Sequence, residues 1–173
     1  MKQIERAVAP SELTNARRPY LSWFGLGGVL LAGSVALFTY NIISAHRVGI
    51  ADPADGQQVE RGRTIYASAC AACHGKNLEG EPNWQSRRPT GELPAPPHDE
   101  SGHTWHHPDT ILFRITKLGG QAEAPPGFRS NMPAFGEVLS DAEIWAVLAY
   151  VKSQWPEPIR ARQAEIDRRN RGR

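Results

Sequence analysis

The five residues Cys70-Ala71-Ala72-Cys73-His74 constrain this chain more than any other feature. They form the C-x-x-C-H pattern through which a haem is attached covalently to protein. The two thiols add across the haem vinyl groups, and a spacing of two residues matches the distance between those vinyls. His74 follows directly, so that an imidazole nitrogen is free to bind the iron. Both cysteines of the chain lie in this motif, which leaves none for a disulfide and predicts a fold built around a haem.

Three other interpretations of the cysteine pair are weaker. A zinc site would need a second Cys or His pair at ligand spacing, which the later histidines could in principle supply. A thioredoxin-like redox pair would open a helix within a βαβ pattern, and no alternating strands are visible in the sequence. A disulfide across two residues would be strained and would leave His74 without a role.

A second iron ligand is predicted at Met132, because the only other methionine is the initiator Met1. A buried methionine is often core filler. Here, however, Met132 precedes a proline, lies 58 residues after His74 and comes just before a strongly predicted helix. Ligation by histidine and methionine raises the reduction potential and leaves the iron six-coordinate, which suits electron transfer.

The motif is preceded by a predicted helix. Asp55 and Gln58 have the spacing of a capping box, and helical periodicity continues to Ala69, directly before the first cysteine. Gly62 lies inside this helix, where glycine costs about 1 kcal/mol relative to alanine. We interpret it as the point at which another helix backbone crosses closely.

Two further helices are predicted from their terminal residues. Pro108 stands at the start of the segment 109–118, and a glycine pair follows it, the usual asymmetry of helix ends. Ser140 and Glu143 form a second capping box, which opens an apolar helix closed by Pro156 and the proline two residues later.

With these elements in place, residues of about 55 to 155 resemble a class I cytochrome c. That family has an N-terminal helix carrying the haem motif, a loop with the methionine ligand, and a C-terminal helix that crosses the first one. Its glycine and aromatic pair on the first helix matches Gly62 and Tyr66, and its apolar and aromatic pair on the last helix matches Val147 and Tyr150. The match covers about 100 of the 173 residues.

The resemblance implies an all-α fold, with about three to five helices around one covalently bound haem c. It assigns the thioether bonds to Cys70 and Cys73 and the iron ligands to His74 and Met132. It also implies an electron carrier rather than an enzyme, working by outer-sphere one-electron transfer through an exposed haem edge.

The N-terminal part of the chain predicts a membrane anchor. No charged residue occurs from Pro19 to Ala45, and most of this stretch is apolar. About 20 such residues suffice to span a bilayer as a helix. A signal peptide cleaved after Ser34-Val35-Ala36 is the alternative, but the apolar run continues past that site and exceeds a usual signal core. We therefore expect one retained transmembrane helix.

The flanking charges predict the orientation of this helix. Lys2, Arg6, Arg17 and Arg18 precede it, whereas only Arg47 follows closely. The positive-inside rule then leaves the N-terminus in the cytoplasm. We expect a single-pass protein of a bacterial inner membrane with its haem domain on the periplasmic face, where bacteria attach haem to this motif.

The expected division of the chain is a cytoplasmic segment 1–19, an anchor 20–45, a linker 46–54, a haem domain 55–155 and a charged tail 156–173. Formal charge is +3 up to Gly49, −4 from 50 to 155 and +3 in the tail, which gives the overall +2. Nothing in this pattern indicates a nucleic-acid partner. The tail arginines alternate with acidic residues and predict a solvated helical extension, with contact to a partner or lipid as the alternative.

Four histidines gather ahead of the second predicted helix: His98, His103, His106 and His107. With Asp99 they could bind copper or zinc, and His98 could replace Met132 on the iron. We favour instead hydrogen bonds from these histidines to haem propionates or loop backbone, with Trp105 packed on the haem edge.

The sequence therefore predicts a membrane-anchored mono-haem cytochrome that carries single electrons between respiratory or other membrane redox complexes. Its lipid contact is the N-terminal helix. The linker of about ten residues spans at most roughly 35 Å, so we expect a neighbouring membrane complex as partner, or a fixed haem subunit of such a complex. The alternatives are a metal-handling protein with a copper-binding histidine loop, and a haem sensor with an open sixth position.

Overall fold

The computed structural model describes residues 31–39 and 49–172. The chain separates into two compact units, Met1–Ile43 and Ser44–Arg173. In the first unit residues 31–39 are helical and exposed. The rest of the predicted anchor, 20–45, lies outside the described residues. Within the described ranges, no helix has both the length and the apolar character needed to span a bilayer.

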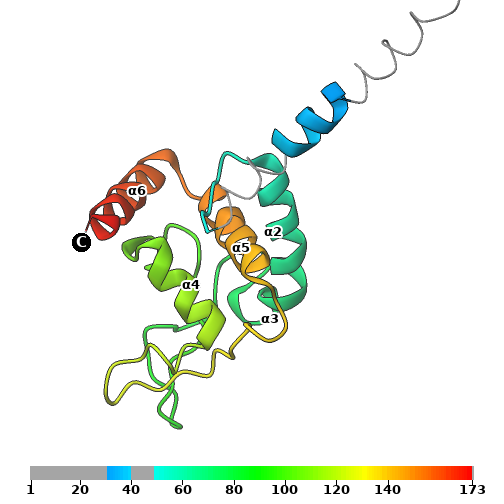
Figure 1. Ribbon diagram of the computed structural model, residues 1–173. Helices are drawn as coiled ribbons and strands as arrows, with labels where there is room; N and C mark the ends of the chain where they lie inside the picture. Colours follow the sequence, from blue (N-terminus) through cyan, green and yellow to red (C-terminus); the bar gives the residue numbers. More distant parts are fainter. Residues whose placement is uncertain (1–30, 40–48, 173) are drawn as a thin grey trace, which may run out of the picture. The chain divides into compact units, whose positions relative to one another are not determined.

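The second unit is built from helices, and the part of it that the structure describes contains no strand (Figure 1). Five α-helices and one 3-10 helix follow in order: α2 (Gly56–Ala69), α3 (Ala71–His74), η1 (Thr104–His106), α4 (Asp109–Leu118), α5 (Asp141–Ser153) and α6 (Glu157–Arg171). The predicted all-α class is confirmed for these residues. The three helices expected from capping signals correspond to α2, α4 and α5.

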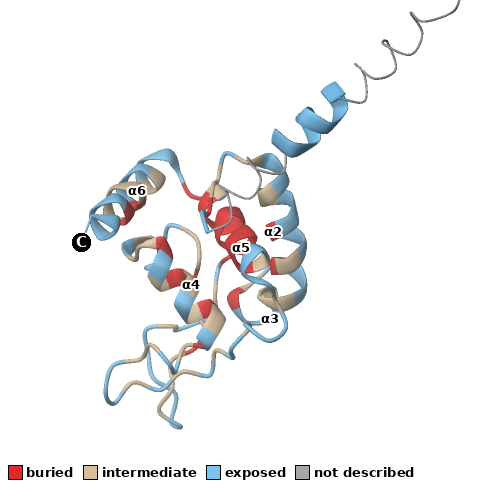
Figure 2. Cartoon of the chain, viewed as in Figure 1, coloured by how far each residue is buried: buried red, intermediate tan, exposed pale blue. Residues whose placement is uncertain are grey.

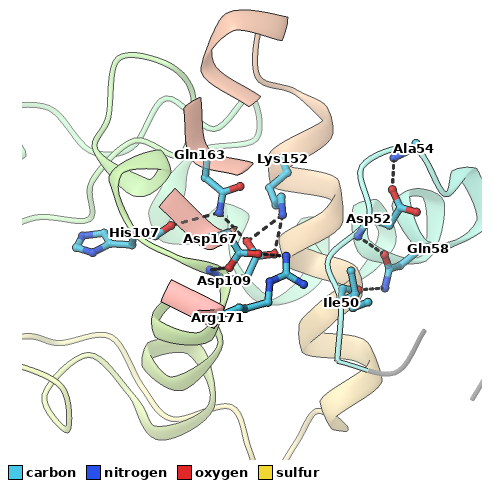
Figure 3. Close-up of polar contacts among 10 residues, drawn as sticks. All are labelled: Ile50, Asp52, Ala54, Gln58, His107, Asp109, Lys152, Gln163, Asp167 and Arg171. Atoms are coloured by element: carbon cyan, nitrogen blue, oxygen red, sulfur yellow. Dashed lines mark hydrogen bonds and ion pairs between the residues drawn. The ribbon is translucent and has the colours of Figure 1, made fainter. Parts of the chain in front are cut away.

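The start of α2 confirms the N-cap predicted at Asp55, but Gln58 does not complete the expected capping box. The Asp55 carboxylate accepts hydrogen bonds from the backbone N–H groups of Gln57 and Gln58, at 3.0 and 3.2 Å. The Gln58 side chain turns to the preceding loop, accepting from Asp52 N at 2.8 Å and donating to the Ile50 carbonyl at 2.8 Å (Figure 3). The Gln58 side chain, which was expected to complete the capping box, therefore holds the loop before the helix instead.

Helices α2 and α5 cross at Gly62, as the glycine predicted. A Cβ atom added there would lie 1.9 Å from the carbonyl oxygen of Ala146, so no larger residue fits without separating the helices. One turn further along α2, the Tyr66 ring packs on Tyr150, with centroids 5.3 Å apart. Helix α5 is buried continuously from Ile144 to Lys152 (Figure 2) and forms the centre of the core.

The boundaries of α4 and α5 follow the predicted signals. At the start of α5, Ser140 Oγ accepts from Glu143 N, and the Glu143 carboxylate accepts from Ser140 N, so both halves of the capping box are present. Helix α4 packs on α5 through the stacked rings of Phe113 and Trp145, whose centroids are 4.4 Å apart.

The C-terminal region differs from the prediction. Helix α5 already ends at Ser153, so Pro156 does not itself terminate it. Pro156 is the N-cap of a separate helix, α6. As expected, the arginines of this helix lie mostly on its exposed face, but Gln163 and Asp167 are buried at 0% and 2% exposure. The tail is therefore not simply a solvated extension.

A buried polar network joins α6 to α4 and α5 (Figure 3). Asp167 accepts from the backbone N–H of Asp109 at 3.0 Å, at the start of α4. The Asp109 carboxylate also accepts from Gln163 Nε2 at 2.7 Å and from Lys152 Nζ at 2.7 and 2.9 Å. Arg171, on the last turn of α6, pairs with Asp167. Polar residues thus dock α6, which explains why apolar periodicity did not predict its packing.

Candidate haem site

The C-x-x-C-H motif forms one short helical turn. Cys70 is the N-cap of α3, its carbonyl accepts from His74 N at 3.0 Å, and Gly75, with a φ of 80°, ends the turn. Cys70 is partly buried, Cys73 is exposed and His74 is buried. Both thiols are free. The turn therefore brings together three of the four predicted site residues.

One side of the His74 ring is already bonded. Its Nδ1–H donates to the carbonyl oxygen of Pro96 at 2.9 Å, and because a carbonyl can only accept, this bond fixes the tautomer. Burial lowers the pKa of His74, which favours the neutral ring. A neutral imidazole whose Nδ1–H is held by a carbonyl presents Nε2 as a metal ligand. The Tyr66 hydroxyl closes the turn by donating to the Gly75 carbonyl at 2.9 Å.

His98 lies against the face of His74. The two rings are stacked with centroids 4.0 Å apart and 22° between their planes. The His98 Nδ1 bonds with Thr104 Oγ1 at 2.8 Å, and desolvation lowers its pKa well below the usual histidine value. Rings in face-to-face contact leave no space for a macrocycle between them, so this arrangement places His98 beside His74 and not as a ligand on the opposite side of an iron.

Of the other predicted histidines, His103 and His107 meet edge to face, with ring centroids 5.0 Å apart. His103 stacks on Trp84 with centroids 6.1 Å apart, and His106 stacks on Trp105 at 3.6 Å. Among the described residues there is no group of three or more Cys, His, Asp or Glu side chains able to hold a metal ion. The structure therefore gives no support to a copper or zinc site in this loop. Packing of Trp105 on a haem edge remains a prediction.

The Cys70 thiol does not have the character of a redox-active cysteine. Burial raises the pKa of the Cys70 thiol to about 11, whereas disulfide-exchanging cysteines have a lowered pKa. The described residues also contain no βαβ unit around the motif. The thioredoxin-like interpretation is therefore unsupported.

Met132 lies in the loop between α4 and α5. Its N–H donates to Ser130 Oγ at 3.2 Å, and its carbonyl accepts from Gly120 N at 3.1 Å. The absence of a side chain at Gly120 permits this approach, since a Cβ there would meet Ser130 Oγ at 2.2 Å. The Met132 side chain is partly buried. Its role as the second iron ligand remains a prediction.

Comparison with known proteins bears directly on this site. Residues 59–155, which include the motif, the methionine loop and the α2–α5 crossing, match the family Cytochrome c. The chain belongs to the cytochrome c family. Membership implies a covalently bound haem c, as the motif predicted.

Two relatives of this cytochrome carry the name Cbb3-type cytochrome c oxidase subunit CcoP. The protein from Azospirillum brasilense is 30% identical over 128 residues, and that from Azospirillum sp. (strain B510) is 27% identical over 128 residues. Each alignment covers 74% of this chain but only 38% of the relative. No solved structure matches this cytochrome.

The residues present fit a covalent haem. Two free thiols and an unbonded His74 Nε2 share one turn, and the nearby apolar cluster includes Tyr66, Leu78 and Cys70. Two contributions to this site were not predicted, the Pro96 carbonyl and the stacked His98 ring. The proline pair at 96–97 was a signal of a rigid backbone there, but a partner 22 residues along the chain from His74 cannot be inferred from local spacing.

Proposed function

We propose that this cytochrome carries single electrons, using one haem c bonded to Cys70 and Cys73 with His74 and Met132 as iron ligands. The observation that supports this best is the buried His74 imidazole. Its Nδ1–H is committed to the Pro96 carbonyl, and it lies on the same turn as two free thiols. This is the arrangement of a fixed metal ligand beside two attachment points.

When bound, the haem supplies a one-electron couple. The chain's own residues keep that centre rigid: Pro96 fixes the tautomer and direction of His74, and the α2–α5 crossing at Gly62 fixes the helix that precedes the motif. Because no proton transfer or bond cleavage is needed, the site requires no catalytic acid or base. Rigidity lowers the reorganisation that accompanies each electron.

The direct test of electron transfer is rapid mixing of the purified reduced protein with a one-electron oxidant in the absence of oxygen. We expect complete, reversible oxidation, with one electron per polypeptide. Haem staining after a denaturing gel provides the control for covalent attachment. A protein that carries no covalent haem, or that gives up more than one electron per chain, would contradict the mono-haem proposal.

We further propose that residues 20–45 anchor the protein in a bacterial inner membrane, with the N-terminus cytoplasmic and the haem domain periplasmic. The uncharged stretch and the cluster of basic residues ahead of it support this. Alkaline carbonate should leave the full chain in the membrane fraction and release a version lacking residues 20–45 that is exported with a cleavable signal. Release of the full chain would count against the anchor.

A fixed place in an oxidase complex is the second candidate. Two observations favour it. Alignments that cover 74% of this chain relate it to two proteins named as oxidase subunits, and the linker at 46–54 is short. A tagged chain extracted in mild detergent should then co-purify with other membrane subunits in constant ratio. A tagged chain that always migrates alone would leave only the carrier role.

A further inference from the structure

One short segment contacts the His74 imidazole twice. The Pro96 carbonyl accepts its Nδ1–H at 2.9 Å, and two residues later the His98 ring covers its face at 4.0 Å. The hydrogen bond sets the direction in which Nδ1 points but leaves the ring free to swing about the N–H···O axis. A flat side chain stacked on one face opposes that swing. Both contacts together define the plane of the ring.

His98 is itself held in place by three hydrogen bonds, two through its backbone and one through its ring. Its backbone N–H donates to the Leu78 carbonyl at 2.7 Å, and its own carbonyl accepts from Trp155 Nε1 at 2.7 Å. The ring nitrogen Nδ1 bonds with Thr104 Oγ1 at 2.8 Å. Trp155 is 1% exposed and Leu78 is 4% exposed, so both backbone partners belong to the core. A side chain fixed this firmly can impose an orientation on its neighbour.

We propose that His98 is a positioning residue for His74: its stacked ring fixes the plane of the ligand imidazole and thereby tunes the haem iron. The inference rests on the proposed function, in which His74 binds that iron. The plane of an axial imidazole determines its overlap with the iron d orbitals, and groups around a metal ligand tune both its orientation and the reduction potential. His98 acts through His74 and does not itself bind iron.

The test compares full-length holoprotein with His98→Leu, which keeps bulk but has no planar ring, and His98→Phe, which keeps a ring and loses the bond to Thr104. Gln57→Leu is the control for introducing a leucine, because Gln57 is exposed on the first turn of α2. The readouts are the spread of haem methyl ¹H NMR shifts in the oxidised protein, the g-anisotropy by electron paramagnetic resonance, and the reduction potential.

We expect His98→Leu to keep its covalent haem while the methyl shifts, the g-values and the potential all change. His98→Phe should return the methyl shifts and g-values close to wild type, and Gln57→Leu should match wild type in all three. A His98→Leu protein with wild-type spectra would overturn the proposal, as would a Phe variant displaced as far as Leu. If the Leu variant does not fold, a Phe variant with wild-type spectra supports the proposal and one with altered spectra contradicts it.

Failure of the underlying function is recognised separately. A wild-type protein without covalent haem after a denaturing gel, or a His74→Ala variant with an unchanged spectrum, would remove His74 from the iron. The positioning role of His98 would fall with it. With wild-type haem content and an altered spectrum in His74→Ala, the outcome of His98→Leu tests the positioning role by itself.

Discussion

At the scale of single residues, Gly62 determines how closely the two central helices approach. The nearest backbone atom would be 1.9 Å from an added Cβ, far inside contact distance, so the helices must separate to accept a methyl group. Overpacking of this kind costs about 1–3 kcal/mol and sometimes more. The position was identified from sequence because a glycine inside a helix is unfavourable unless packing requires it.

We therefore predict that Gly62→Ala lowers the free energy of unfolding by at least about 2 kcal/mol, measured by chemical denaturation of the oxidised holoprotein. Gly56→Ala is the matched control, because a Cβ there has nothing within 4 Å. It should leave stability equal or slightly higher, since alanine favours the helix. Equal losses in both variants would contradict a specific effect of the crossing.

The residues of the candidate site were predictable to different degrees. Cys70, Cys73 and His74 were identified as candidates because the C-x-x-C-H spacing is the one that covalent haem attachment requires. The Pro96 hydrogen bond and the stacking of His98 on His74 were not predicted, although His98 was named as a possible iron ligand, because these contacts join distant parts of the chain. Local spacing carries no information on which loop returns to cover a given turn.

At the scale of elements, the capping residues predicted the starts of helices α2 and α5 correctly. The Ser140 capping box was predicted from two residues and is present with both hydrogen bonds. We predict that Ser140→Ala lowers the free energy of unfolding by about 1 kcal/mol, because a backbone N–H at the start of α5 loses its partner. Ser68→Ala, an exposed position inside α2, should change it by less than about 0.5 kcal/mol. Equal effects in thermal melts would contradict a specific role for the cap.

The packing of helix α6 could not be predicted from hydrophobic periodicity. Its buried positions are Gln163 and Asp167, and polar residues leave no apolar periodicity to follow. Its docking depends on Asp109, which receives bonds from two other helices. The helix was expected from its composition, but its attachment to the haem domain became visible only in the structure.

We predict that Lys152→Met strongly destabilises the protein. The Lys152 and Asp109 side chains are only 10% and 7% exposed, so removing the cation leaves a buried carboxylate without its charge partner, at a cost of about 3–5 kcal/mol. Lys117→Met is the control, since the Lys117–Asp141 pair is 38% and 52% exposed and should contribute about 1 kcal/mol or less. Urea denaturation of both variants decides the question; similar midpoints would contradict the role of the buried network.

At the scale of the whole molecule, the haem domain is small, and most of the buried apolar residues that the structure describes fall into two clusters, one around Tyr66 and Trp155 and one around Leu112 and Trp145. Small domains bury a smaller fraction of their surface than large ones, and we expect the haem to add to the apolar interior here. We predict that the Cys70→Ser, Cys73→Ser double variant lacks covalent haem and loses most of its near-ultraviolet circular dichroism. A double variant with a native spectrum would show that the protein core is sufficient on its own.

We propose that His74 and Met132 close the iron to other ligands. The most direct measurement is the visible spectrum of the purified protein, oxidised for the weak far-red sulfur-to-iron band, and reduced with and without carbon monoxide. We expect a far-red band and no response to carbon monoxide. In Met132→Ala the band should disappear and carbon monoxide should bind. A wild-type protein that lacks the band and binds carbon monoxide readily would remove Met132 from the site and contradict a closed electron-transfer centre.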